Sequence, residues 1–405
     1  MIESSKVEYG CRLADLGLVT ALGSTPAENW TRLVNEDPVR ICLRDDLIPG
    51  ESLKFGSVSD ELPPIPEHLQ RYAGRNNQLA LAAYETIADS ARLAIAKYGA
   101  HRVGVVVGSS TACVAEAELA FRKRQPEGDV GADFALVQIS YGGLSEFLQE
   151  ISGAAGPCYA LSTACSSGAK AIAAARRLLD LGICDAVISG AVDSLCKLTS
   201  NGFRALQALS KDVSNPMSVS RDGLNLGEGA ALFLLLREPG GVQVLGAGES
   251  SDAHHISAPS PDGSGAYRAM EASLADSGLG VSEIAYLNLH GTGTPQNDAM
   301  ESAAVHRLFG SRVPCSSTKP FVGHTLGASG AVEAAFCWLV LASRVGNELI
   351  LPPHVFDGEY DSSMPELSLV SRGDRAKVSA VASVMSNSFG FGGSNCSLIF
   401  SAGAA

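Results

Sequence analysis

Residues 160–169 read Ala-Leu-Ser-Thr-Ala-Cys-Ser-Ser-Gly-Ala, a segment in which an apolar, β-like stretch turns into a helix of small residues. The pattern predicts that Cys165 takes the first helical position. A helix N-terminus carries roughly half a positive charge and unpaired backbone N–H groups, so a cysteine placed there tends to have a lowered pKa. We therefore expect Cys165 to react as a thiolate nucleophile.

Two histidines lie downstream in glycine-rich turns. His290 is in residues 288–295, Asn-Leu-His-Gly-Thr-Gly-Thr-Pro, and His324 is in residues 319–327, Lys-Pro-Phe-Val-Gly-His-Thr-Leu-Gly. Histidines in such turns can simply satisfy backbone carbonyls. One thiol with two imidazoles, each in its own turn, is however typical of cysteine-based acyl transfer. The sequence therefore predicts one site shared by Cys165, His290 and His324.

Short apolar segments alternate with alanine-rich helical patterns, which predicts βα units, mainly parallel sheets and helices on the faces of those sheets. The fold class is therefore α/β. The chain has 405 residues, more than the roughly 250 to 300 that one hydrophobic core usually serves, so we expect two similar halves. We place them at residues 1–240, with the nucleophile, and 241–405, with both histidines. Small residues at 166–169 and 327–331 predict that one helix of each half packs back to back with the other.

The composition argues against several classes of protein. The formal net charge is −13 and no long basic run is present, so we expect no nucleic-acid partner. The ten cysteines are scattered without a Cys-x-x-Cys pair, as in reduced cytoplasmic proteins. The first residues lack the pattern of a signal peptide, and no apolar run approaches the ~20 residues that cross a bilayer. We expect a cytoplasmic protein without a membrane span.

Together these motifs resemble those of the β-ketoacyl-[acyl-carrier-protein] synthases of the elongating Cys-His-His type. The similarity covers nearly the whole chain and includes, besides the segments above, residues 16–23 (Leu-Gly-Leu-Val-Thr-Ala-Leu-Gly), 220–230 (Ser-Arg-Asp-Gly-Leu-Asn-Leu-Gly-Glu-Gly-Ala) and 386–395 (Ser-Asn-Ser-Phe-Gly-Phe-Gly-Gly-Ser-Asn). The resemblance implies a thiolase-like fold, in which two similar βα halves with layered sheets enclose buried central helices in the order α-β-α-β-α.

The resemblance also implies a decarboxylative Claisen condensation. Cys165 would accept an acyl group from the phosphopantetheine of an acyl carrier protein. Malonyl-[acyl-carrier protein] would then lose CO2, and its enolate would attack the acyl-cysteine, extending a fatty-acid, polyene or polyketide chain by two carbons. His290 and His324 would donate N–H groups to the thioester oxygen on which negative charge develops. The resemblance implies no further cofactor and no metal.

Further positions take roles by the same resemblance. Lys319 and Glu301 would complete the catalytic set as an ion pair that holds the histidine turns, because a buried lysine needs a carboxylate. The backbone N–H groups of Cys165 and Phe391 would form the oxyanion hole, and Phe391 would gate the acyl pocket on a mobile glycine loop. The remaining positions are Gly390 and Gly392 in that loop, Thr111 at the gate of the acyl pocket, and Thr292 and Thr294 on the pantetheine arm.

Alternatives remain open for partner and reaction. The chain is expected to form a homodimer, or a heterodimer with a related ketosynthase-like chain as the active half of a ketosynthase/chain-length-factor pair. A catalytically silent chain-length factor would lack the nucleophile, whereas Cys165 is present. A coenzyme A-dependent thiolase would need a second cysteine such as Cys396, but that residue precedes the apolar stretch 397–400 without a Cys-x-Gly turn.

Overall fold

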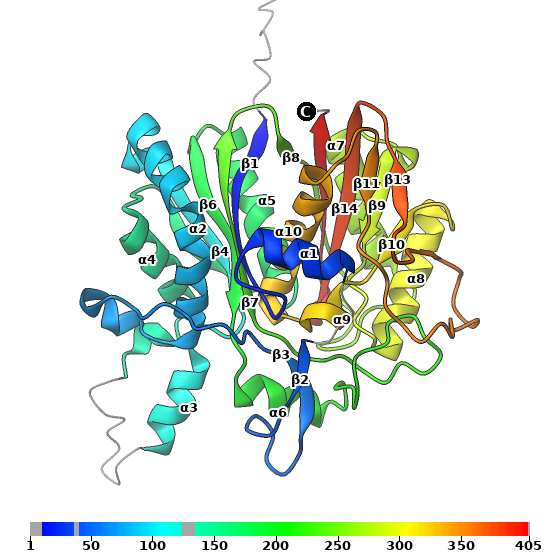
Figure 1. Cartoon of the computed structure of the whole chain (residues 1–405), viewed down its shortest axis with the longest axis horizontal. Helices are drawn as coiled ribbons and strands as arrows, with labels where there is room; N and C mark the ends of the chain where they lie inside the picture. The colour runs from blue at the N-terminus through cyan, green and yellow to red at the C-terminus, as the bar shows by residue number, and fades with distance from the viewer. Residues whose placement is uncertain (1–9, 36–39, 124–133, 404–405) are drawn as a thin grey trace, which may run out of the picture.

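The computed structural model describes residues 10–35, 40–123 and 134–403. Its main element is an 11-stranded sheet in the order β12-β10-β9-β14-β15-β8-β1-β7-β6-β4-β5, made of two half-sheets (Figure 1). The first half-sheet contains β1 (Cys11–Val19), β4 (Val103–Gly108), β5 (Cys158–Leu161), β6 (Ala186–Asp193) and β7 (Gly229–Arg237). The second contains β8 (Val242–Ser251), β9 (Ile284–Asn288), β10 (Pro314–Ser316), β12 (Ser368–Leu369), β14 (Val381–Gly390) and β15 (Ser394–Gly403). Arg12 of β1 pairs with Gln243 of β8 where the half-sheets meet.

Strand directions repeat in the two half-sheets, but the sheets are mixed rather than mainly parallel. Strands β6, β4 and β5 run parallel, and β7 runs antiparallel to both β6 and β1. Likewise β14, β9 and β10 run parallel, and β15 runs antiparallel to both β14 and β8. The prediction of mainly parallel sheets is therefore wrong. Strands β14 and β15 are an example, because only residues 391–393 connect them and so short a connection forms an antiparallel hairpin.

Two central helices, α5 (Ser167–Asp180) and α10 (Ser329–Ala342), pack against each other between the half-sheets (Figure 1). Glycines allow the close approach. A Cβ on Gly168 would lie 2.7 Å from the backbone N of Ala331, and a Cβ on Gly330 would lie 2.8 Å from the backbone N of Ala169. The predicted back-to-back packing of the two helices is confirmed.

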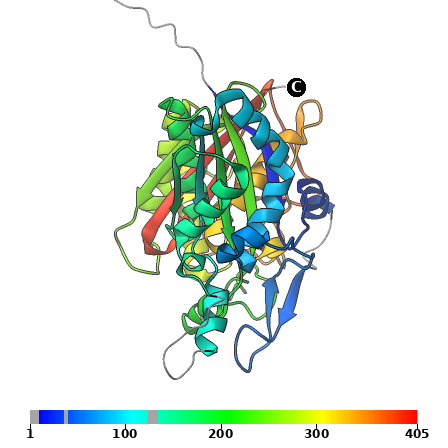
Figure 2. The same ribbon diagram turned by 90° about the vertical axis from the view of Figure 1, so that its left-hand side faces the viewer.

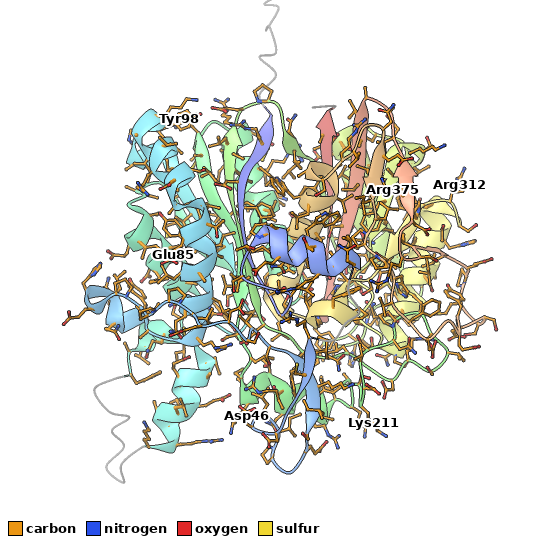
Figure 3. The ribbon with its side chains drawn as sticks, in the orientation of Figure 1. Asp46, Glu85, Tyr98, Lys211, Arg312 and Arg375 are labelled. Carbon is orange, nitrogen blue, oxygen red and sulfur yellow. The ribbon has the colours of Figure 1, made fainter. Side chains whose placement is uncertain are left out.

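Helices also cover the outer faces and complete the predicted α-β-α-β-α layering. Helices α2 (Arg75–Tyr98) and α4 (Tyr141–Ser152) cover the first half-sheet, as Figure 2 shows, and α7 (Ser264–Ser277) packs on the second beside α8 (Pro295–Phe309). Buried hydrophobic residues form a central cluster around α5 and α10 and a further cluster on the outer side of each half. Charged side chains such as Glu85, Arg312 and Arg375 lie at the periphery (Figure 3).

The other described α-helices and strands lie outside the layers named so far. They are α1 (Pro26–Asn35), α3 (Val114–Arg122), α6 (Lys197–Ala205), α9 (Lys319–Val322), β2 (Ile41–Arg44), β3 (Leu53–Gly56), β11 (Glu348–Ile350) and β13 (Arg375–Lys377). Within the described part of the chain, no helix combines the length and the apolar character needed to cross a bilayer.

Candidate active site

Cys165, His290 and His324 meet in one buried site. His324 Nε2 lies 3.0 Å from Cys165 Sγ. The two imidazole rings stand at 87° to each other with their centroids 5.3 Å apart. Sγ and one nitrogen of each ring lie within 4.8 Å of one another. The structure therefore brings together the three residues that the sequence analysis placed in one site.

The turn that carries Cys165 lies between β5 and α5. Cys165 precedes the first helical residue, Ser167, by two positions, so it does not take the first helical position as predicted. Ala164 adopts a left-handed conformation with φ +52°. Ser167 Oγ closes the turn by accepting the Thr163 N–H at 2.8 Å and donating to the Ala164 carbonyl at 2.6 Å. The helix start therefore fixes the shape of the nucleophile turn without containing the nucleophile.

Burial decides the ionisation of Cys165. The residue is 5% exposed, and burial raises the pKa of its thiol to about 11. Lys319 and the backbone N–H groups of Phe391 and of Cys165 itself act in the opposite direction on this pKa. The predicted lowering of the pKa is wrong, because the thiol is enclosed and lies outside the helix. Cys165 is therefore a neutral thiol at pH 7.

The hydrogen-bond partners fix which nitrogen of each imidazole carries the proton. His324 Nδ1 accepts the Leu326 N–H at 3.2 Å, and His290 Nδ1 lies 3.3 Å from the Lys319 ammonium, which can only donate. Burial and, after it, Lys319 lower the pKa of both rings well below the usual histidine value, so both are neutral at pH 7. A neutral ring that accepts at Nδ1 carries its proton on Nε2. Both rings therefore carry an N–H donor at Nε2.

Lys319 pairs with Glu333 and not with Glu301. Its ammonium contacts Glu333 Oε1 and the carbonyl oxygen of His290. Glu301 instead accepts the backbone N–H groups of His290 and Gly291 at 2.8 and 2.7 Å. Burial raises the pKa of both carboxyl groups to about 7. The predicted pair of Lys319 with Glu301 is wrong, because the Glu301 carboxylate on α8 is used by the backbone of the His290 turn.

Sequence reasoning missed two buried acids, Glu333 and Asp193. Glu333 is the one charged residue of the otherwise apolar helix α10, and an isolated charge in such a helix is a signal of a buried ion pair. Asp193, at the end of β6, accepts the Thr111 N–H and hydroxyl at 2.8 and 2.7 Å and the Gly327 N–H at 2.6 Å. Asp193 thus ties the loop after β4 to the turn that follows His324.

A cavity of about 430 Å³ leads to the reactive groups. Of the predicted positions, Thr292, Thr294 and Gly390 line it together with Phe391, and the two threonine hydroxyls lie 2.8 Å apart. Phe391 is 37% exposed and stacks on Phe203 with the ring centroids 5.4 Å apart. Lining residues that the sequence analysis did not assign to the site include Phe203, Gln207, Asp222, Asp252 and Asn395.

Four of the predicted positions are not among the described residues that line this cavity: Lys319 and Glu301, whose contacts are given above, and Thr111 and Gly392. Thr111 is buried, with its hydroxyl bonded to Asp193. Gly392 has φ +80° and open space where a Cβ would project, so its backbone conformation, rather than close packing, favours glycine there. At Gly390 the approach is close, because a Cβ would lie 2.9 Å from the Thr163 carbonyl oxygen and 3.3 Å from the Cys165 N.

Cys165, His290 and His324 are also the single group of three possible metal ligands found among the described residues. Thiolate and imidazole are zinc ligands. Metal binding at Nε2 would require each ring proton to move to Nδ1, where it would face the Leu326 N–H or the Lys319 ammonium. The donor set therefore fits a developing negative charge better than it fits a cation.

Comparison with known proteins gives matches along most of the chain. The model of the beta-ketoacyl synthase N-terminal domain matches residues 17–239, and the model of the C-terminal domain matches residues 242–351. A 3-oxoacyl-[acyl-carrier-protein] synthase 2 of Rhizobium meliloti is 41% identical over 263 residues, which is 60% of this chain and 60% of that protein. A protein of the same name from Staphylococcus aureus is 31% identical over 358 residues, 83% of this chain and 87% of that protein.

Solved structures give a match over the full length. The structure of a ketosynthase (ApeO) in complex with its chain length factor (ApeC) from Xenorhabdus doucetiae contains a chain that superposes with a TM-score of 0.90 and 38% identity. The superposition covers 100% of this chain and 100% of that chain. The overall fold described above is therefore shared with a protein of known structure.

Proposed function

The chain belongs to the β-ketoacyl synthase family, and from this premise we propose that Cys165, His290 and His324 carry out the two stages of its condensation reaction. The protein is an acyltransferase-type condensing enzyme with the thiolase-like α/β fold expected from the sequence. The observation that carries the proposal is that one thiol and two imidazoles with assigned proton positions lie within 4.8 Å of one another.

In the first stage Cys165 takes up the acyl group. Its sulfur attacks the carbonyl carbon of an acyl thioester, the thiol proton passes to the departing pantetheine sulfur, and an acyl-cysteine thioester remains. The tetrahedral intermediate carries a negative oxygen, and the backbone N–H groups of Cys165 and Phe391 are our candidates for its donors. Both N–H groups act on the pKa of the Cys165 sulfur, which supports their nearness to the reacting atoms.

In the second stage the two histidines act on the malonyl thioester. Loss of CO2 leaves a pair of electrons that the thioester carbonyl takes up as an enolate, and negative charge grows on its oxygen. Neutral imidazoles with protons on Nε2 are suitable donors to this oxygen, because each can stabilise the negative charge by a hydrogen bond without changing its own protonation state. The enolate carbon then attacks the acyl-cysteine carbonyl, the Cys165 sulfur leaves as a thiolate, and a proton taken up from solvent restores the thiol. The product is two carbons longer than the acyl group.

Lys319, Glu301 and Glu333 are positioning residues in this scheme. Glu301 holds the backbone of the His290 turn, and Lys319, neutralised by Glu333, holds the His290 ring and carbonyl. Phe391 is proposed as the gate, since its ring stacks on Phe203 at the cavity lining while its backbone N–H acts to lower the pKa of Cys165. Gly390 and Gly392 give the gate loop its shape, Thr111 adjoins the acyl pocket, and Thr292 and Thr294 bind the pantetheine arm.

An acyl carrier protein is the proposed partner, and its phosphopantetheine is the one prosthetic group that the reaction needs. A second chain is proposed as well, either a second copy or a related ketosynthase-like chain. The structure that holds a chain 38% identical over its whole length is a complex of a ketosynthase (ApeO) with its chain length factor (ApeC), which supports the heterodimer. We also propose that residues 1–240 and 241–405 are the two halves of the fold, since strand order repeats between them, and that the enzyme works in the cytoplasm.

A coenzyme A-dependent thiolase is the weaker candidate. Its second cysteine would have to reach the reacting atoms. Cys396 lies within β15, is fully buried and is absent from the described lining of the cavity, and burial raises its pKa strongly. Its thiol is therefore in no position to act as an acid or base beside Cys165.

Acyl transfer from a loaded carrier tests the proposal directly. The wild-type protein is expected to gain the mass of the acyl group in intact-mass spectrometry, and Cys165→Ala is expected to gain none. His290→Ala and His324→Ala should still load, but product formation with malonyl carrier should fall by roughly 100-fold or more, the effect typical of a lost oxyanion donor. A Cys165→Ala protein that still loads, or histidine variants that condense at the wild-type rate, would overturn these assignments.

A further inference from the structure

His354 is a buried histidine outside the catalytic cavity, on the loop that follows β11. The residue is 7% exposed. Its Nδ1 accepts the Ser317 N–H at 3.1 Å, and its Nε2 lies 2.9 Å from the Pro216 carbonyl oxygen. A ring that accepts at Nδ1 and donates at Nε2 is neutral, and burial, which lowers the pKa of His354 to about 4, keeps it so at pH 7. His354 therefore bridges two backbone segments with a fixed hydrogen-bond polarity.

On the Nδ1 side, Ser317 leads to the turn that carries His290. Ser317 Oγ donates to the Gly291 carbonyl oxygen at 2.6 Å and accepts the Lys319 N–H at 3.3 Å. Gly291 has φ +36°, and a Cβ there would lie 2.6 Å from Ser317 Cβ. Ser317 thus lies directly against the His290 turn, and His354 holds Ser317 by its backbone.

On the Nε2 side, Pro216 leads to the same turn from the other direction. The next residue, Met217, is fully buried with φ +65°, and its N–H donates to Asp298 Oδ2 at 2.9 Å. Asp298 Oδ1 accepts the Gly293 N–H at 3.2 Å. Gly293 lies between Thr292 and Thr294, the proposed pantetheine ligands. A shift of Pro216 would therefore reach the threonine segment through Met217 and Asp298.

These contacts form a chain of hydrogen bonds from Gly291 to Gly293. The backbone through Thr292 joins the two glycines, so the chain is closed. Its members are Gly291, Ser317, His354, Pro216 with Met217, Asp298 and Gly293. We propose that His354 is a positioning residue whose Nδ1 end sets the placement of His290 and whose Nε2 end sets the placement of Thr292 and Thr294. This inference rests on the proposed function, because it assigns the two ends to the enolate donor and to the pantetheine arm.

Two substitutions test the two ring nitrogens of His354 independently. In His354→Asn, the side-chain oxygen can replace Nδ1 as acceptor for Ser317, while the donor to Pro216 is lost. In His354→Gln, the terminal NH2 can replace Nε2 as donor to Pro216, while the acceptor is lost. We expect His354→Asn to raise KM for malonyl carrier roughly tenfold with kcat nearly unchanged, and His354→Gln to lower kcat of condensation roughly tenfold with KM nearly unchanged. At saturating acyl carrier, loading of Cys165 should stay within about twofold of wild type in both variants, because loading does not use the enolate donor and a weakened pantetheine contact raises only the KM for the carrier.

His306→Gln is the matched control, since His306 Nδ1 contacts the Glu366 carbonyl oxygen at an exposed position away from the closed chain. Ser317→Ala tests the same end independently, because it removes the bond to Gly291, and it should behave like His354→Gln. Equal losses of loading and condensation in all variants would show that His354 only stabilises the fold, and this result would overturn the inference. Wild-type kinetics in all His354 and Ser317 variants would also overturn it. A wild-type protein that neither loads nor condenses would instead refute the proposed function.

Discussion

Cys165 differs from a surface thiol because the protein encloses it almost completely. Burial raises the pKa of the thiol to about 11, against the pull of Lys319 and of two backbone N–H groups. At neutral pH the reactive thiolate is therefore a small fraction, and that fraction grows with pH until the pKa is reached. The sequence motif correctly marks the nucleophile, but local sequence carries no information on how deeply the remote loops bury it.

Alkylation kinetics test this ionisation. The rate of iodoacetamide modification at Cys165, followed by peptide mass spectrometry, is expected to rise about tenfold per pH unit between about pH 7 and 9, because only the thiolate reacts. The exposed Cys42 in the same samples serves as the internal reference for reagent quality. A rate at Cys165 that levels off below about pH 8 would show a lowered pKa.

The carboxylate that neutralises Lys319 gives a second test at this scale. Glu333→Gln leaves a buried ammonium without its counter-charge, so we expect a loss of about 3–5 kcal/mol in the free energy of unfolding and a large fall in condensation. Glu301→Gln keeps the ion pair of Lys319 with Glu333 and weakens one of the two hydrogen bonds to the backbone. The free energy of unfolding should therefore fall by only about 1–3 kcal/mol. Urea unfolding of both variants measures the difference. The reverse ranking would mean that Lys319 relies on Glu301 after all.

At the scale of elements, the crossing of α5 and α10 fixes the site. Gly330 lies at the crossing, where a Cβ would be 2.7 Å from Ser388 Oγ and 2.8 Å from the Ala169 N. Gly330→Ala is therefore expected to cost about 1–3 kcal/mol of unfolding free energy through overpacking and to slow condensation by moving the His324 turn. Gly202→Ala in α6 is the matched control, because a Cβ there meets nothing within 4 Å.

The control should be neutral or slightly stabilising, since alanine favours a helix over glycine by about 0.5–1 kcal/mol. Thermal unfolding and steady-state condensation rates are the measurements. Equal behaviour of Gly330→Ala and Gly202→Ala would mean that the helices can separate without consequence, contrary to the packing described here.

The same elements show what the sequence could and could not predict. Runs of small residues at 166–169 and 327–331 are local patterns, so the packing of α5 on α10 could be foreseen. The β14–β15 hairpin could also have been predicted from its three-residue connection. The antiparallel pairing of β7 with β6 could not be predicted, because a long connection separates the two strands. Likewise Glu301 and Glu333 both lie on helices near Lys319, and only the three-dimensional arrangement decides between them.

At the scale of the whole molecule, the central hydrophobic cluster belongs to both halves. It includes residues of α5 and α10 and of both half-sheets, and Trp30 of α1 and Trp338 of α10 pack against it from different halves of the chain. We therefore expect the 405-residue chain to unfold in one cooperative step. The two halves expected from the length therefore share one central hydrophobic cluster.

The two tryptophans are the only ones in the chain, so each half has its own reporter. Trp30→Phe and Trp338→Phe leave a single tryptophan in the second and first half respectively. Their fluorescence should give coincident midpoints in urea, and both should coincide with the loss of far-ultraviolet circular dichroism. Two separated transitions would show that residues 1–240 and 241–405 unfold independently.

The reciprocal glycine contacts, Gly168 against Ala331 and Gly330 against Ala169, have a functional consequence. They relate the two central helices by an approximate internal symmetry, and a turn with a reactive side chain, Cys165 or His324, precedes each helix. The two tasks are divided between these turns, with the nucleophile before α5 and a proposed donor to the developing charge before α10. Loss of the thiol alone would then silence the chemistry and leave the architecture intact.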